Sequence, residues 1–169
     1  MLRVLTQARA PGSAAQTASL ARLCRRYVRA LGLIDCELSL SVVTDAQIRA
    51  VNRQWRGKDA PTDVLSFPAG DQPLGPGQLR PLGDVVISIE TAKVRAREDG
   101  RPLGAELARY LAHGLLHLLG HDHHAKAEAA RMAREEKRLL GEVGLVEAAL
   151  GSIDTRRSRP PKSGSRRRP

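Results

Sequence analysis

Five histidines lie within one short stretch, AHGLLHLLGHDHH, at residues 112–124, and the chain has no others. Three of them, His113, His117 and His123, have the spacing of the zinc ligands in a large class of metalloproteases. Residues four apart on a helix lie on one face, so His113 and His117 can reach the same ion. The stretch therefore predicts a metal centre to which His123 supplies a third nitrogen.

A glycine after the helical pair provides a route for the third histidine to return. Gly120 can adopt the left-handed conformation that ends a helix, and the chain can then reverse to bring His123 back. Three neutral imidazoles on Zn²⁺ leave a fourth position for water, which is the arrangement of a catalytic site. We expect one zinc ion, held by these three histidines.

The other polar residues of this stretch are not part of the predicted ligand set. We expect His121 and His124 to be plain exposed side chains, with a secondary ligand or a proton carrier as the alternative. Asp122 either orients a ligand histidine or caps the turn.

The residue after the first histidine is a glycine, although the metalloproteases with this spacing have a glutamate there as general base. Gly114 therefore weakens the prediction of a peptidase. It does not exclude one, because a carboxylate from elsewhere in the chain could take this role.

A second motif, NRQWRGKDAPTDVLSFP, contains basic residues suited to a phosphate. The planar guanidinium of Arg56 can clamp a phosphate and stabilise charge that develops in a transition state. Lys58 lies close by in the sequence, whereas we expect Arg53 to be a solvated surface charge.

Three motifs together resemble the YbeY family of bacterial endoribonucleases, which act in ribosomal RNA maturation. NRQWRGKDAPTDVLSFP, LGDVVIS and HGLLHLLGHDH occur in this order over roughly residues 36–145. The resemblance implies that His113, His117 and His123 bind zinc and that Arg56 is functional. The family usually has an aromatic residue where His121 stands here.

The resemblance also implies an activity and a set of partners. We expect a zinc-dependent endoribonuclease, specific for single strands, that acts near the 3′ end of small-subunit ribosomal RNA and in ribosome quality control. Its partners would be precursor ribosomal RNA and the small subunit or its assembly factors. The alternatives are a zinc peptidase, favoured by the histidine spacing alone, and a non-catalytic assembly factor with a structural zinc.

Hydrophobic periodicity predicts the elements that position these residues. Strands are expected at 2–6, 36–43, 62–67 and 83–89, and helices at 11–32, 44–55, 90–98, 103–119 and 125–140. The helix at 44–55 should open with a capping box of Thr44 and Gln47 and bury Ile48, Val51 and Trp55. The helix at 103–119 is apolar almost all round and should be buried.

Early strands and late helices predict one α+β domain over residues 1–150, with a small mixed sheet packed by helices and the zinc site on a central buried helix. Residues 151–169 are expected to form a disordered basic tail. This tail has seven basic residues and one acidic residue, a net +6 of the chain's total of +10. Such a tail suits a polyanion such as RNA or serves as a solvated end.

Composition bears on the cellular compartment of the protein and on how it could bind RNA. Two cysteines without a CxxC motif fit a reducing compartment, and no apolar run is long enough for a signal peptide or a membrane span, so we expect a cytoplasmic protein without membrane partners. One Trp, one Phe and two Tyr are too few for an RNA-binding platform of several stacked rings.

Overall fold

The computed structural model describes residues 1–70, 73–121 and 126–150, with side chains as far as Gly141. The elements in chain order are β1 (Leu2–Ala8), α1 (Ala14–Ala30), β2 (Cys36–Val43), α2 (Asp45–Arg56), β3 (Val64–Pro68), β4 (Arg80–Ser88), α3 (Ile89–Glu98), α4 (Leu103–Leu118) and α5 (Lys126–Leu150).

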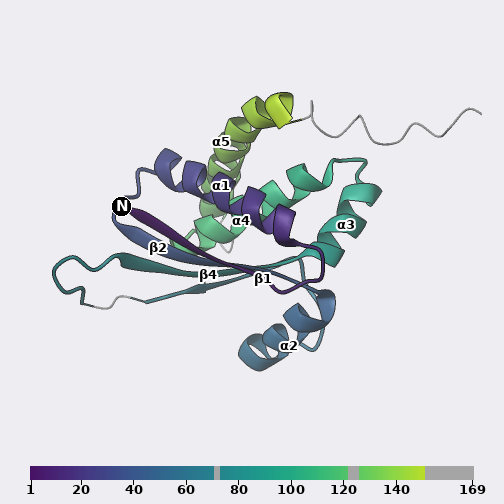
Figure 1. Ribbon diagram of the computed structural model, residues 1–169, viewed down its shortest axis with the longest axis horizontal. Helices are drawn as coiled ribbons and strands as arrows, with labels where there is room; N and C mark the ends of the chain where they lie inside the picture. The colour runs from purple at the N-terminus through teal and green to yellow at the C-terminus, as the bar shows by residue number, and fades with distance from the viewer. Residues whose placement is uncertain (71–72, 122–125, 151–169) are drawn as a thin grey trace, which may run out of the picture.

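The strands form one mixed sheet in the order β1-β2-β4-β3. Strands β1, β2 and β4 run parallel, and β3 pairs antiparallel with β4 as an edge strand. Helices α1, α3, α4 and α5 lie on one side of the sheet, whereas α2 lies on the other (Figure 1). The expected single α+β domain with a small mixed sheet is confirmed.

The main core lies between the sheet and the four helices on its covered face. Strand β2 shows why, because its alternate residues Cys36, Leu38, Leu40 and Val42 are all buried in this core. The residues between them point to the opposite face and are only half-buried. This alternation, predicted from the sequence, determines which face of the sheet receives the helices.

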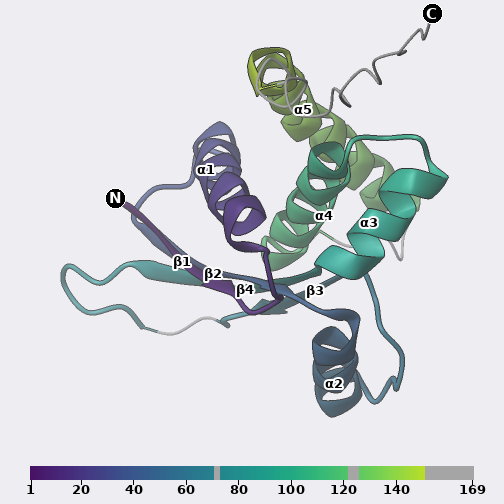
Figure 2. The same cartoon turned by 45° about the vertical axis from the view of Figure 1, so that its right-hand side comes forward.

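Helix α4 is the central helix of the domain. It contacts β3, β4, α1, α3 and α5, and Figure 2 shows it between α1 and α3 above the sheet. Its apolar residues are buried around most of its circumference, as expected for a helix hydrophobic on nearly all sides. The histidine pair is therefore carried by the most enclosed helix of the fold.

Helix α2 packs against the opposite face of the sheet. Thr44 and Gln47 form the expected capping box at its start. Ile48 is fully buried in a small second core with Val43 and Leu65. The prediction that Trp55 belongs to this core is wrong: its side chain is 67% exposed, because it lines an open pocket between α2 and the sheet, against the ring of Phe67.

Strand β4 contains a bulge that the sequence pattern did not predict. The register with β2 shifts between Glu37 and Leu38, so one extra residue of β4 is accommodated next to Gly83. Gly83 has φ +126°, and a Cβ there would lie 2.1 Å from the carbonyl oxygen of Phe67. Glycine is therefore required for β4 to pass so close to β3.

None of the helices within the described residues is long and apolar enough to cross a membrane. Residues 151–169, which carry the predicted basic tail, lie outside the described part of the chain.

Candidate metal and phosphate site

Two of the predicted ligands converge on helix α4. The Nε2 atoms of His113 and His117 lie 3.0 Å apart, and both side chains line a pocket of about 680 Å³. Two nitrogens at this separation can both lie at the ~2.0–2.1 Å distance of a zinc–nitrogen bond from a single point. The donor types and their spacing therefore fit one zinc ion.

The third predicted ligand cannot be placed. His123, together with Asp122 and His124, lies outside the described residues. The described chain does show how the return would begin. Helix α4 ends at Leu118, and Gly120 has φ +83°, the left-handed conformation predicted for it.

A carboxylate that the sequence analysis did not single out fixes the orientation of His113. Oε1 of Glu136, on helix α5, lies 2.5 Å from Nδ1 of His113. This hydrogen bond from His113 lowers the pKa of Glu136 below its ordinary value, against the opposing effect of burial. Glu136 is therefore ionised at neutral pH and can only accept a hydrogen bond.

The tautomer of His113 follows from that contact. Because a carboxylate has no proton to give, Nδ1 of His113 must be the donor, and in the neutral ring Nε2 then carries the lone pair. This lone pair is on the side of the ring that faces His117. Metal-binding histidines commonly donate their second ring N–H to a carboxylate in this way.

Gly114 explains the missing peptidase base in structural terms. A Cβ at this position would lie 3.0 Å from both Ser66 Oγ and Val85 Cγ1, and 3.3 Å from a methyl of Val64. The position faces strands β3 and β4, so a glutamate there would press on these side chains and require them to shift. The close packing therefore disfavours the peptidase arrangement on this helix.

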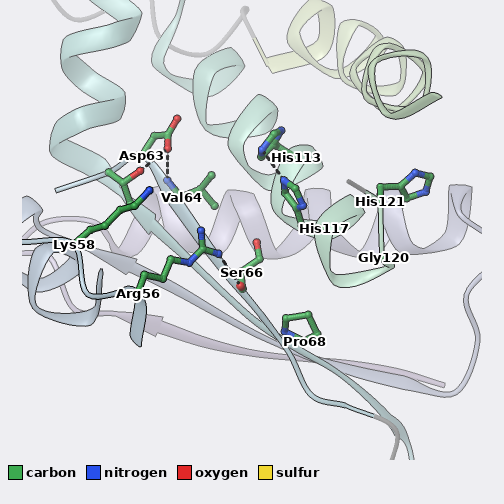
Figure 3. Close-up of a pocket in the computed structure, with 11 residues that line it drawn as sticks. Arg56, Lys58, Asp63, Val64, Ser66, Pro68, His113, His117, Gly120 and His121 are labelled. Atoms are coloured by element: carbon green, nitrogen blue, oxygen red, sulfur yellow. Dashed lines mark hydrogen bonds between the residues drawn. The ribbon is translucent and has the colours of Figure 1, made fainter. Parts of the chain in front are cut away.

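The end of helix α2 and strand β3 form the other side of the pocket. Its lining includes Arg56, Lys58, Thr62, Asp63, Val64, Ser66 and Pro68, opposite His113, His117, Gly120 and His121. Figure 3 shows Arg56 and Lys58 across the cavity from His113 and His117. Basic groups thus face the imidazoles over an open space, an arrangement suited to an anion between them.

Arg56, the predicted phosphate-binding residue, lines the pocket from the last position of α2, one residue beyond the end expected for this helix. Gly57, at φ +67°, ends the helix just after it. Arg56 Nη2 donates to the carbonyl oxygen of Ser66 at 3.4 Å, a long and weak contact. A guanidinium has five N–H donors, so this contact leaves donors for a ligand.

The expectation that His121 is a plain exposed side chain is wrong. His121 is half-buried and lines the pocket, and its backbone N–H donates to the carbonyl oxygen of Leu116. Figure 3 places it beyond Gly120, with its ring directed away from His117.

Sequence reasoning missed Glu136 because it lies 23 residues from His113. One signal was present. Met132 and Leu139 are buried in the main core, and Glu136 lies between them at helical spacing. A glutamate on the apolar face of a helix requires a partner, and this one has His113.

Known proteins resemble this chain over most of its length. The family model described as Endoribonuclease YbeY matches residues 9–144. The chain belongs to the YbeY family. The Endoribonuclease YbeY of Myxococcus xanthus (strain DK1622) is 61% identical over 126 residues, which are 75% of this chain and 43% of that protein. That of Anaeromyxobacter sp. (strain Fw109-5) is 55% identical over 151 residues, which are 85% of this chain and 77% of that protein.

A solved structure shares the fold. The solution structure of TM1509 from Thermotoga maritima has a TM-score of 0.64 and 25% sequence identity, and the match covers 94% of this chain and all of that one. The resemblance predicted from the three motifs is thus confirmed. The prediction of an RNA-cleaving hydrolase agrees with the name that the YbeY relatives carry.

Proposed function

We propose that this chain is a zinc-dependent endoribonuclease that cleaves single-stranded RNA during ribosomal RNA maturation, near the 3′ end of the small-subunit RNA. The observation that carries the proposal is the pairing of two groups across one pocket. The imidazoles of His113 and His117 lie on one side, and the guanidinium of Arg56 lies on the other.

In this proposal His113, His117 and His123 hold one zinc ion. The ion, when bound, would supply Lewis-acid activation of water or of a phosphate oxygen. Glu136 keeps Nε2 of His113 available by accepting a hydrogen bond from the Nδ1–H group. The precursor RNA would be bound with the small subunit or its assembly factors in the cytoplasm, as the family resemblance implies.

The basic side of the pocket would position the phosphate. Arg56 donates N–H groups to a phosphate oxygen and neutralises charge that develops during cleavage. Lys58 adds a second positive charge to the same wall of the pocket. Asp63 also lines the pocket, but its Oδ1 accepts hydrogen bonds from the Thr62 hydroxyl and the Val64 N–H. These contacts hold the turn that leads into β3.

The two alternatives have less support. Peptidases with this histidine spacing have a glutamate base after the first histidine, whereas position 114 is a glycine packed closely against β3 and β4. A purely structural zinc would be closed off by a fourth protein ligand. The described histidines instead open onto a pocket large enough for a nucleotide-sized group.

The test compares two substrates under the same metal conditions. Precursor ribosomal RNA and casein are incubated with the full-length protein, with and without a zinc chelator. We expect RNA cleavage that stops with chelator and returns with added zinc, while casein stays intact. Cleavage of casein in place of RNA would overturn the proposal, as would RNA cleavage indifferent to the chelator.

Zinc content tests the ligand set separately. His117→Ala should lose the zinc that the purified wild-type protein contains, at about one ion per chain. His121→Ala is the matched control, because His121 lines the same pocket but is not a proposed ligand. Full zinc in the first variant would remove the proposed site. Loss of zinc in the second would indicate a closed, structural centre.

A further inference from the structure

The uncovered face of the sheet contains a second pocket, of about 560 Å³, next to the first. Helix α2 covers only one end of this face (Figure 1). The pocket lies between α2 and the strands, and Trp55, Phe67, Val51, Gln47, Arg9 and Asp84 are part of its lining. The proposed reaction does not use this pocket.

Trp55 is the most prominent side chain of the second pocket. It is 67% exposed, although a tryptophan is among the largest apolar groups that a protein can bury. Its ring lies against that of Phe67, with centroids 6.2 Å apart and planes at 58°. The exposed Trp55 thus rests on the half-buried Phe67, and this contact restricts the orientation of the indole.

The two pockets meet across the edge strand β3. Ser66 lines the histidine pocket, and the next residue, Phe67, lines the second one. In the same way, Arg56 lines the histidine pocket and the preceding residue, Trp55, lines the second one. Consecutive side chains of a strand point to opposite faces, so the two pockets lie on the two sides of β3. Because β3 is an edge strand, a polymer whose phosphate lies at Arg56 can reach Trp55 around this edge.

The charge around Trp55 favours a polyanion. Residues 49–59 contain Arg49, Arg53, Arg56 and Lys58 against the single acid Asp59. Arg49 binds both oxygens of Asp59, at 2.8 and 2.9 Å. Arg53, Arg56 and Lys58 thus give the segment around Trp55 an excess of positive charge, while Arg9 and Asp84 balance each other in the lining of the second pocket.

From this arrangement we infer that Trp55 stacks on a base of the single-stranded RNA whose neighbouring phosphate is bound at Arg56. The inference rests on the proposed ribonuclease function and adds a base-binding position to it. Unpaired bases of RNA stack on aromatic side chains, whereas bases within a duplex are not available for this. A stacking position beside the phosphate clamp would therefore select single strands, whatever their sequence.

Intrinsic fluorescence provides a direct test, because Trp55 is the only tryptophan of the chain. The full-length protein is titrated with a short single-stranded RNA, with the same sequence as a duplex, and with a strand of equal phosphate count that lacks bases at its centre. We expect saturable quenching by the single strand and much weaker quenching by the other two. No quenching by the single strand, or equal quenching by the abasic strand, would overturn the inference.

Substitution provides the second arm of the test. Loss of one base–aromatic stack typically weakens single-strand binding by about fivefold to about a hundredfold. Trp55→Ala should show this loss by anisotropy of labelled RNA, and Trp55→Phe should recover part of it. Val94→Ala is the matched control, because Val94 is an exposed apolar residue of α3, on the other side of the sheet.

The two proposals fail in distinguishable ways. If wild-type protein cleaves RNA and Trp55→Ala binds it as tightly as wild type, the stacking position is wrong and the ribonuclease proposal stands. Binding of a protein partner at the second pocket, with no effect of RNA on Trp55, would likewise overturn the stacking position. If the wild-type protein neither binds nor cleaves RNA, the proposed function itself fails.

Discussion

Replacing Glu136 with glutamine should weaken zinc binding without disturbing the fold. The carboxylate lies 2.5 Å from His113 Nδ1 and is the group that sets the tautomer of that ring. Glutamine keeps an oxygen that can accept a hydrogen bond from Nδ1–H, but it loses the negative charge. It also brings an NH₂ donor that can turn toward the ring and favour the wrong tautomer. Zinc then encounters a less basic and less well-oriented nitrogen.

The magnitude follows from the type of contact. A hydrogen bond to a charged group contributes about 1.5–3 kcal/mol. Both side chains are partly exposed, 33% for His113 and 24% for Glu136, so the lower half of that range applies to the loss of charge alone. At about 1.4 kcal/mol per tenfold change, Glu136→Gln should weaken zinc affinity roughly tenfold. Glu136→Ala, which removes the acceptor as well, should approach a hundredfold.

The assay is a competition titration of apo protein with a chromophoric zinc chelator. The nitrogen chemical shifts of the His113 ring report its tautomer directly and do not depend on catalysis. Glu135→Gln is the matched control. It makes the same substitution at the adjacent residue of α5, where the carboxylate binds Arg138 and not a histidine. Melting temperatures of all the variants show whether the fold is retained.

One result would refute this reasoning about the site. If Glu136→Gln and Glu135→Gln both bind zinc as tightly as the wild-type protein, then the carboxylate does not act through His113. A loss of affinity shared equally by both variants would point to the general charge of α5. Only a loss confined to Glu136 fits the contact in the structure.

Three further predictions concern the same region and the tail. Arg56→Ala should lower RNA cleavage by about a hundredfold to a thousandfold (~2.7–4 kcal/mol), with zinc content and melting temperature unchanged. Arg56→Lys should recover only part of the rate. Cleavage by Arg56→Ala at the wild-type rate would show that Arg56 is only a surface charge. Gly114→Ala should lower the melting temperature, because its Cβ would meet Ser66 and Val85 at 3.0 Å. Gly141→Ala, whose Cβ would have nothing within 4 Å, should raise it. A higher melting temperature for Gly114→Ala would show that β3 and β4 can shift at little cost. Deleting residues 151–169 should leave the fold intact and make RNA binding less dependent on salt. The slope of log binding constant against log salt concentration should become shallower by roughly 0.7 for each phosphate that the tail no longer neutralises. An unchanged slope would show that the tail does not contact RNA.

The parts of the site that sequence predicted are the parts fixed by local geometry. His113 and His117 share a face because any α-helix places residues four apart on one side. Thr44 and Gln47 cap α2 through contacts within a single turn. The alternation along β2 likewise follows from the strand period alone. None of these needs knowledge of which element packs against which.

The parts that sequence did not predict depend on contacts between distant segments. Glu136 reaches His113 only because α5 packs on α4. Trp55 has the helical spacing of a buried residue, but it is exposed, because burial at the end of α2 depends on how that helix lies against the sheet. The pairing of Arg56 with the histidines depends in the same way on where β3 lies against α4. The family resemblance, rather than periodicity, provided the prediction that these groups act together.

Gly114 connects the absence of a peptidase base with the presence of the phosphate clamp. A Cβ at this position would lie 3.0 Å from Ser66 Oγ and Val85 Cγ1, so a longer side chain would require these neighbours to give way. Ser66 also accepts the hydrogen bond from Arg56 through its carbonyl oxygen. The glycine that stands in place of a proteolytic base therefore packs against the same residue of β3 that Arg56 contacts, and Ser66 links the two sides of the pocket.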